Sequence, residues 1–210
     1  MIMKKFQLLA MAILVAMSVS AQKKYAPKRT KVKAKTANIL ITPKLGVNFS
    51  DLTSVDNTKV KIGLVAGVEG LYMVKPKFGV SAGLLYSDQG SSLDVSSGSS
   101  DLNLAYINLP VLANFYVADG LALKVGLQPG YLLSANAKVS GGGTNSDTDV
   151  KDNFETLDIS IPLGMSYEFN NFVIEGRYNL GLTKIPKGSN TKDSKNSVIQ
   201  VTIGYRFNTK

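Results

Sequence analysis

The feature that most constrains this chain is an alternation of apolar and polar side chains, repeated in segments of about ten residues. In residues 172–182, Phe172 and Ile174 fall on one face of an extended chain, whereas Glu175 and Arg177 fall on the other. No segment after residue 38 keeps a helical period over a useful length, so the expected fold class is all-β. The alternation predicts eight strands, at residues 39–49, 61–73, 77–87, 102–117, 121–134, 157–169, 172–182 and 198–207.

The connections between the expected strands alternate between short and long. Three of them, Lys75-Pro76, Asp119-Gly120 and Asn170-Asn171, are tight turns of the kind that β-hairpins need. The other four are long and polar, at 50–60, 88–101, 135–156 and 184–197. Short turns at one end and long loops at the other are typical of an outer-membrane barrel, with its turns in the periplasm and its loops outside the cell.

The charges on the polar face indicate which face of the strands lines the interior. That face carries four basic and four acidic side chains in mid-strand: Lys44, Glu69, Lys124, Asp158, Glu168, Glu175, Arg177 and Arg206. Many glycines share this face, and a narrow lumen crossed by long paired side chains needs small neighbours. The apolar face has aromatic residues near the turns, as in the interfacial girdle of a membrane barrel. We therefore expect an eight-stranded antiparallel up-and-down transmembrane β-barrel, with the eight charges as a structural polar network in its lumen.

A soluble fold remains the alternative. A lipocalin-like barrel would line its interior with apolar side chains, and a soluble sandwich would have two-sided sheets.

The prolines inside the expected strands argue against uninterrupted pairing, because proline has no N–H to donate to a neighbouring strand. We expect bulges or local unpairing at the four prolines that fall inside strands, Pro43, Pro110, Pro129 and Pro162.

The N-terminus has the composition of an export signal. Lys4 and Lys5 precede an apolar run at 8–17, and small residues follow up to Ala21. The apolar run is shorter than the ~20 residues that a membrane-spanning helix needs. Residues 1–21 are therefore expected to be a secretory signal peptide.

The next segment, residues 22–38, is basic. Its first part, residues 22–36, contains seven Lys and Arg residues and no acidic residue. Together with Lys4 and Lys5 these account for the whole net charge of +9, so the remaining barrel domain, residues 39–210, is balanced. We interpret residues 22–38 as a disordered tail. Because an exported protein rarely meets nucleic acid, we expect no nucleic-acid partner.

The residue types argue against an enzyme. The chain has no Cys and no His, which excludes a thiolate nucleophile, an imidazole base and an imidazole metal ligand. Asp147, Asp149, Asp152 and Glu155 cluster in sequence, but they lack the glycine and the ordered spacing of a calcium loop. We therefore expect no catalytic residue, no cofactor and no metal site.

Several segments resemble a known family. Residues 104–115, Leu-Ala-Tyr-Ile-Asn-Leu-Pro-Val-Leu-Ala-Asn-Phe, are similar to the tyrosine-then-proline strand of the PorT-like outer-membrane β-barrel domain family, whose members include small barrels labelled as porins. Residues 126–135 resemble its next strand, and residues 177–182 and 204–207 resemble its last two. The resemblance covers residues 39–210. It implies an eight-stranded outer-membrane barrel in a Gram-negative bacterium, without enzymatic activity, and one branch of the family takes part in protein secretion.

Three functions are consistent with this sequence. The first is a structural or interaction barrel that contacts protein partners through the loops at 50–60, 88–101, 135–156 and 184–197. The second is a narrow porin-like channel, and the third is a component of a protein secretion apparatus. In each case the expected partners include outer-membrane lipid and the barrel-assembly machinery.

Overall fold

The computed structural model describes residues 39–53, 58–95, 98–141, 144–187 and 194–208. The expected signal peptide and the basic segment at 22–38 therefore lie outside the described residues. The described chain forms one antiparallel sheet and a short 3₁₀ helix, η2 (Lys151–Asn153). Its strands are β1 (Ile39–Leu52), β2 (Thr58–Lys75), β3 (Phe78–Val95), β4 (Gly98–Asn108), β5 (Val111–Ala118), β6 (Leu121–Gly141), β7 (Thr144–Asp149), β8 (Leu157–Phe169), β9 (Phe172–Gly181), β10 (Asn196–Tyr205) and β11 (Phe207–Asn208).

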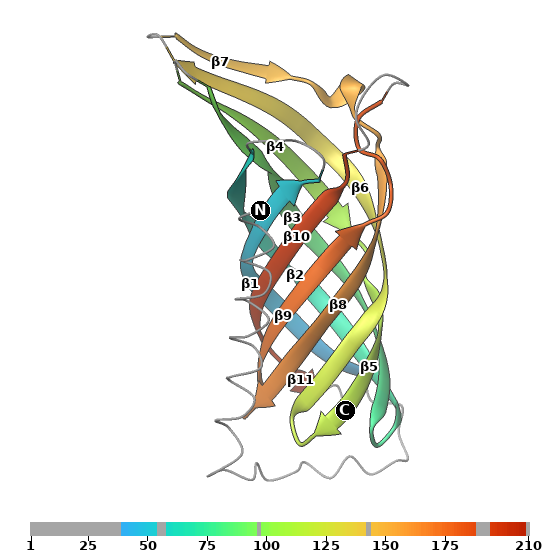
Figure 1. Cartoon of the computed structure of the whole chain (residues 1–210). Helices are drawn as coiled ribbons and strands as arrows, with labels where there is room; N and C mark the ends of the chain where they lie inside the picture. The colour runs from blue at the N-terminus through green and yellow to red at the C-terminus, as the bar shows by residue number, and fades with distance from the viewer. Residues whose placement is uncertain (1–38, 54–57, 96–97, 142–143, 188–193, 209–210) are drawn as a thin grey trace.

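The sheet closes on itself as a barrel with eight strand positions around the ring, which we call staves (Figure 1). β4 and β5 form one stave, β10 and β11 form another, and β7 lies outside the ring. Around the ring the strands pair in the order β1-β2-β3-β4-β6-β8-β9-β10, and β5 continues the position of β4 between β3 and β6. β1 pairs with β10 to close the ring, from Lys44 opposite Gly204 to Leu52 opposite Asn196. The expected up-and-down eight-stranded architecture is thus confirmed. No helix among the described residues is long and apolar enough to cross a membrane.

The outward face of the barrel is apolar. Leu45, Ile62 and Leu157 are 61%, 66% and 65% exposed, and most outward positions of the staves carry Leu, Ile, Val, Phe or Tyr. The turn end has outward aromatic contacts, with ring centroids 5.1 Å apart for Phe78–Phe115 and 5.2 Å apart for Phe172–Tyr205. A water-soluble barrel would bury these side chains. The inside-out arrangement is the one that a lipid solvent favours.

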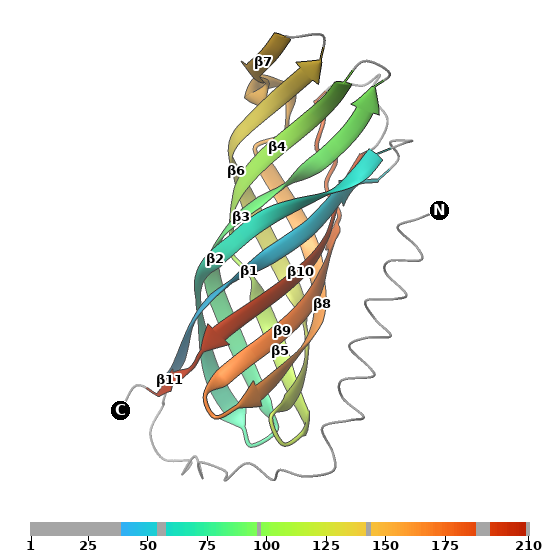
Figure 2. The ribbon, with the colours of Figure 1, turned by 90° about the vertical axis from the view of Figure 1, so that its left-hand side faces the viewer.

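Two of the four segments that were expected to be loops contain strands, so the loop prediction is wrong for them. Residues 88–101 continue β3 to Val95 and begin β4 at Gly98, and residues 135–156 continue β6 to Gly141 and include β7 and η2. These strands rise above the rest of the barrel as one sheet, in the order β3-β4-β6-β7 (Figures 1 and 2). Because both faces of a strand in water can be polar, the apolar–polar alternation disappears there although the backbone pairing continues.

The other two connections are closer to the expectation. β1 ends at Leu52 and β2 begins at Thr58, whereas the described parts of 184–197 contain no strand before Asn196. The expected strand at 102–117 is divided into β4 and β5 by Leu109 and Pro110. That division is one example of how the prolines interrupt strand pairing in this barrel.

Each in-strand proline lies where at least one strand ladder is interrupted, so local unpairing is confirmed. Pro43 lies in the gap between the pairs Lys44–Gly204 and Ile41–Phe207, and this gap separates β10 from β11. Pro110 lies between β4 and β5, and Pro129 of β6 lies opposite this break, where Leu109 N–H donates to the carbonyl of Pro129. Pro162 lies in a gap of the β6–β8 ladder. The register shifts that mark bulges occur elsewhere, for example between Ala105 and Tyr106.

Several inward glycines lie where neighbouring strands approach each other closely. A Cβ at Gly46, Gly67 or Gly126 would lie 2.0, 2.1 and 2.0 Å from the carbonyl oxygens of the neighbouring strand. The strands therefore approach each other at these points too closely for any side chain. Glycine allows the strong coiling of a narrow barrel, in addition to any room it leaves for long side chains.

Candidate functional site: the lumen and its closed mouth

Five of the eight charged residues singled out in the sequence meet in the middle of the lumen. Lys44 comes from β1, Glu69 from β2, Lys124 from β6, and Glu175 and Arg177 from β9. They meet because each lies at an inward position of its strand, and the register aligns the strands at this height: Lys44 is opposite Gly67 and Gly204, and Lys124 is opposite Gly164. All five side chains are buried.

Each carboxylate of this lumen cluster contacts all three cations. The Lys44 and Lys124 Nζ atoms each lie 2.9 Å from an oxygen of Glu69, and the Arg177 guanidinium lies 3.2 Å from the same carboxylate. Glu175 receives Lys44 at 3.2 Å and Lys124 at 2.5 Å, and it also pairs with Arg177. Such mutual pairing is what makes buried charges tolerable. Because the five side chains come from opposite sides of the ring, the cluster crosses the lumen.

The other three charged residues are separate from this cluster. Towards the turn end, Arg206 pairs with Glu168 and also approaches the Tyr116 hydroxyl at 3.5 Å. Towards the loop end, Asp158 accepts hydrogen bonds from the Thr183 hydroxyl and, at 3.1 Å, from the Asn196 amide. The eight residues thus occupy three levels of the lumen instead of one network.

Uncharged polar side chains fill the levels between the charges. The Asn48 amide donates to the Ser87 hydroxyl at 2.9 Å, and the Asn114 amide donates to Ser81 at 3.0 Å. The side-chain amides of Asn179 and Gln200 are buried and have no hydrogen-bond partner among the described residues. Buried polar groups of this kind normally bind ordered water. Sequence reasoning did not select these amides, although Asn48 continues the inward alternation that starts at Lys44.

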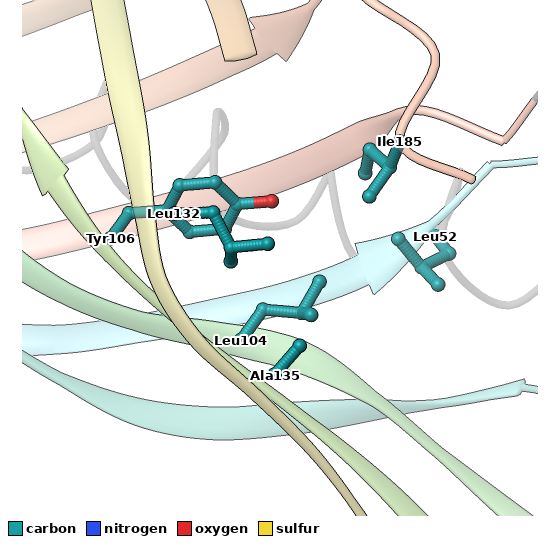
Figure 3. Packing of buried hydrophobic residues seen from close by; sticks show 6 residues of the cluster. All are labelled: Leu52, Leu104, Tyr106, Leu132, Ala135 and Ile185. Carbon is teal, nitrogen blue, oxygen red and sulfur yellow. The ribbon is translucent and has the colours of Figure 1, made fainter. Parts of the chain in front are cut away.

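The loop end of the lumen is closed by apolar side chains, which sequence reasoning missed. Leu104 and Tyr106 of β4, Leu132 and Ala135 of β6, Leu52 at the end of β1, and Ile185 form a buried cluster (Figure 3). Leu102, Val150 and Phe154 pack against it. We call this cluster the apolar cap.

The segments that follow β7 and β9 hold the apolar cap in place. Glu155 N–H donates to the carbonyl of Ile185 at 2.7 Å, and Lys187 N–H donates to the carbonyl of Asn153 at 2.9 Å. Ile185 N–H in turn donates to the carbonyl of Ser194 at 3.0 Å. The cap is therefore part of the hydrogen-bonded structure. Its members come from distant parts of the chain, so no local pattern identifies it.

The described residues have no feature of a metal centre, since no three acidic side chains among them are grouped to hold an ion. The lumen formed by these residues contains three levels of charged side chains, uncharged polar side chains and an apolar cap. This composition provides tight packing and hydrogen bonding across the ring.

A closed antiparallel sheet with an apolar exterior and a paired polar lumen defines a transmembrane β-barrel. The model of the outer membrane protein beta-barrel domain matches residues 21–186. The chain belongs to this outer-membrane β-barrel family, and its place is the outer membrane. No curated protein matches the chain.

Solved structures with related folds are distant in sequence. The attachment invasion locus protein Ail of Yersinia pestis is 17% identical, with 82% of this chain and 100% of that chain covered and a TM-score of 0.49. Neisserial surface protein A is 12% identical, with the same coverage and a TM-score of 0.48. OprG from Pseudomonas aeruginosa is 14% identical, with 83% and 98% covered and a TM-score of 0.41.

Proposed function

We propose that this protein is a closed, non-enzymatic barrel that presents the raised sheet of β3, β4, β6 and β7 as an interaction surface outside the cell. The observation that carries the proposal is the combination of a blocked lumen with a structured extension above it. The lumen cluster crosses the middle of the barrel, and the apolar cap closes its loop end. A lumen filled in this way supports the barrel, whereas the raised sheet is the part that partners can reach.

Conductance distinguishes this proposal from a narrow porin-like channel. We expect the purified protein to show no discrete channel openings in a planar bilayer. A variant with Leu132→Gly and Ile185→Gly thins the apolar cap but leaves the lumen cluster in place, and we expect it to remain closed as well. Stable openings of the unmodified protein would contradict the proposal.

The interaction role can be tested by removing the upper hairpin. Ala135 and Val150 are adjacent, because the Val150 N–H donates to the Ala135 carbonyl at 2.9 Å. Residues 136–149 can therefore be replaced by an Asn-Gly turn without opening the barrel. Surface crosslinking on intact cells should lose its protein partners in this variant, provided that the barrel still folds. Unchanged crosslinks would rule out this hairpin as the contact.

The resemblance to PorT-like barrels supports a second candidate, a component of a protein secretion apparatus. The specific observation is the tyrosine-then-proline segment, in which Leu109 and Pro110 separate β4 from β5. The candidate predicts that a deletion strain retains secreted cargo in the periplasm. We further propose that residues 1–21 are the export signal, which would place the mature N-terminus at Gln22 in N-terminal sequencing. The partners are then outer-membrane lipid, the barrel-assembly machinery and surface proteins, without nucleic acid.

A further inference from the structure

The outward face of β3, β4 and β6 changes from apolar to polar within one step along the strands. Tyr86, Ile107 and Tyr131 are neighbours across these three strands and form the last row that is apolar on all three. Leu133, the unpaired residue of the bulge on β6, adds one exposed apolar side chain beside it. The next outward row is Asp88, Ala105 and Ser134, and Asn103 pairs with Asn136 in the row above it. Figure 2 shows these three strands side by side as they leave the barrel. Such a step marks the level of the lipid headgroups.

A hollow lies at this step, on the outside of the sheet. It has a volume of about 210 Å³ and is lined by residues of both polar rows, by Tyr86 below and by Lys138 above. Two local features create it. The register shifts between Ala105 and Tyr106 so that Leu133 has no partner on β4, and the small side chain of Ala105 lies at the centre of the row. A bulge of this kind bends the strand, and a methyl group fills little of the resulting space. We call this hollow the headgroup groove.

The headgroup groove offers unused hydrogen-bonding groups. Within the part of the chain that the structure describes, the side chains of Asn103, Ser134 and Asn136 make no hydrogen bond. Asp88 forms an ion pair with Lys61, with 2.9 Å between the Lys61 Nζ and an Asp88 carboxylate oxygen. Lys138 lies 3.6 Å from Asp147, and both side chains are more than half exposed, so this ion pair is weak and its cation is available.

We propose that the headgroup groove binds the sugar-phosphate headgroup of a glycolipid in the outer leaflet. The Asn103 and Asn136 amides match adjacent sugar hydroxyls, because an amide donates and accepts at once. Lys138 supplies a cation for phosphate. The apolar row of Tyr86, Ile107 and Tyr131 lies directly below, where acyl chains attached to the same headgroup would run. A free sugar or phosphate could use only the polar half of this surface.

The test uses the full-length mature protein in detergent and native mass spectrometry, with purified lipopolysaccharide as the probe. Ala105→Leu fills the groove, and Lys138→Ala removes its cation. Ala82→Leu, on the outward face of β3 in mid-barrel, and Lys75→Ala, at the turn end, are the matched controls. Phosphatidylglycerol and inorganic phosphate distinguish the sugar-phosphate headgroup from phosphate alone. Folding of every variant is checked by its mobility in unboiled gels.

We expect saturable binding of lipopolysaccharide that Ala105→Leu and Lys138→Ala each weaken about tenfold, while the two controls leave it unchanged. Phosphatidylglycerol and phosphate should bind much more weakly. Equal binding of phosphatidylglycerol would overturn the sugar-phosphate assignment. Unchanged affinity in a folded Ala105→Leu variant would show that the ligand binds elsewhere. This inference is independent of the proposed interaction with protein partners.

Discussion

Replacing Glu175 by glutamine tests whether the lumen cluster holds the barrel together. The substitution keeps the shape of the side chain and removes one of the two carboxylates that three buried cations share. Glu69 would then be left with Lys44, Lys124 and Arg177, so the local charge rises from +1 to +2. Breaking a buried ion pair by removing one partner costs about 3–5 kcal/mol, and we expect a loss of unfolding free energy in that range.

The assay is reversible urea unfolding of the mature protein in phospholipid vesicles. Asp147→Asn is the matched control, because its partner Lys138 lies 3.6 Å away and both side chains are more than half exposed. We expect this control to lose about 1 kcal/mol or less. Adding Lys124→Met to Glu175→Gln restores the charge balance and should recover part of the lost stability. A loss below about 1 kcal/mol for Glu175→Gln would refute the reasoning, because it would mean that water in the lumen already solvates these charges.

Three further predictions concern the closed barrel, the close approach of its strands and its lipid-facing side chains. The mature protein should run at a different apparent mass in unboiled and boiled gels, and the absence of a shift would contradict a closed membrane barrel. Gly46→Ala should abolish this shift because its Cβ would lie 2.0 Å from a carbonyl oxygen, whereas Gly70→Ala meets its nearest atom at 3.6 Å and should retain it. Leu45→Arg should lower the urea-unfolding free energy by about 2–4 kcal/mol, since the side chain faces lipid, and a neutral effect would place Leu45 outside the apolar band.

The barrel staves could be predicted from the sequence because lipid imposes a strict alternation on every strand that crosses it. Leu45 and Ile62 face outward and Lys44 and Glu69 face inward, and this difference is visible in the chain itself. The prolines were also informative, since a missing N–H must interrupt one ladder wherever the proline lies.

The raised sheet and the apolar cap could not be predicted in this way. The six residues of β7, Thr-Asn-Ser-Asp-Thr-Asp, are polar at every position, so they lack the alternation that identifies a strand. The apolar cap combines Leu52, Leu104 and Ile185, which are far apart in the sequence and meet only after the ring has closed. The grouping of the eight charges into three levels likewise depends on strand register, which the sequence pattern does not specify.

The pairing of β1 with β10 has a consequence for how the protein assembles. These strands are the most distant partners in the ring, so their contact forms only after the intervening chain is in place. Lys44 reaches Glu175 across this seam, 131 residues away. Until the seam closes, the open sheet keeps Lys44 apart from half of its counter-charge. Closing the seam adds the ion pair of Lys44 with Glu175 to its pair with Glu69, so charge compensation favours the final step of assembly.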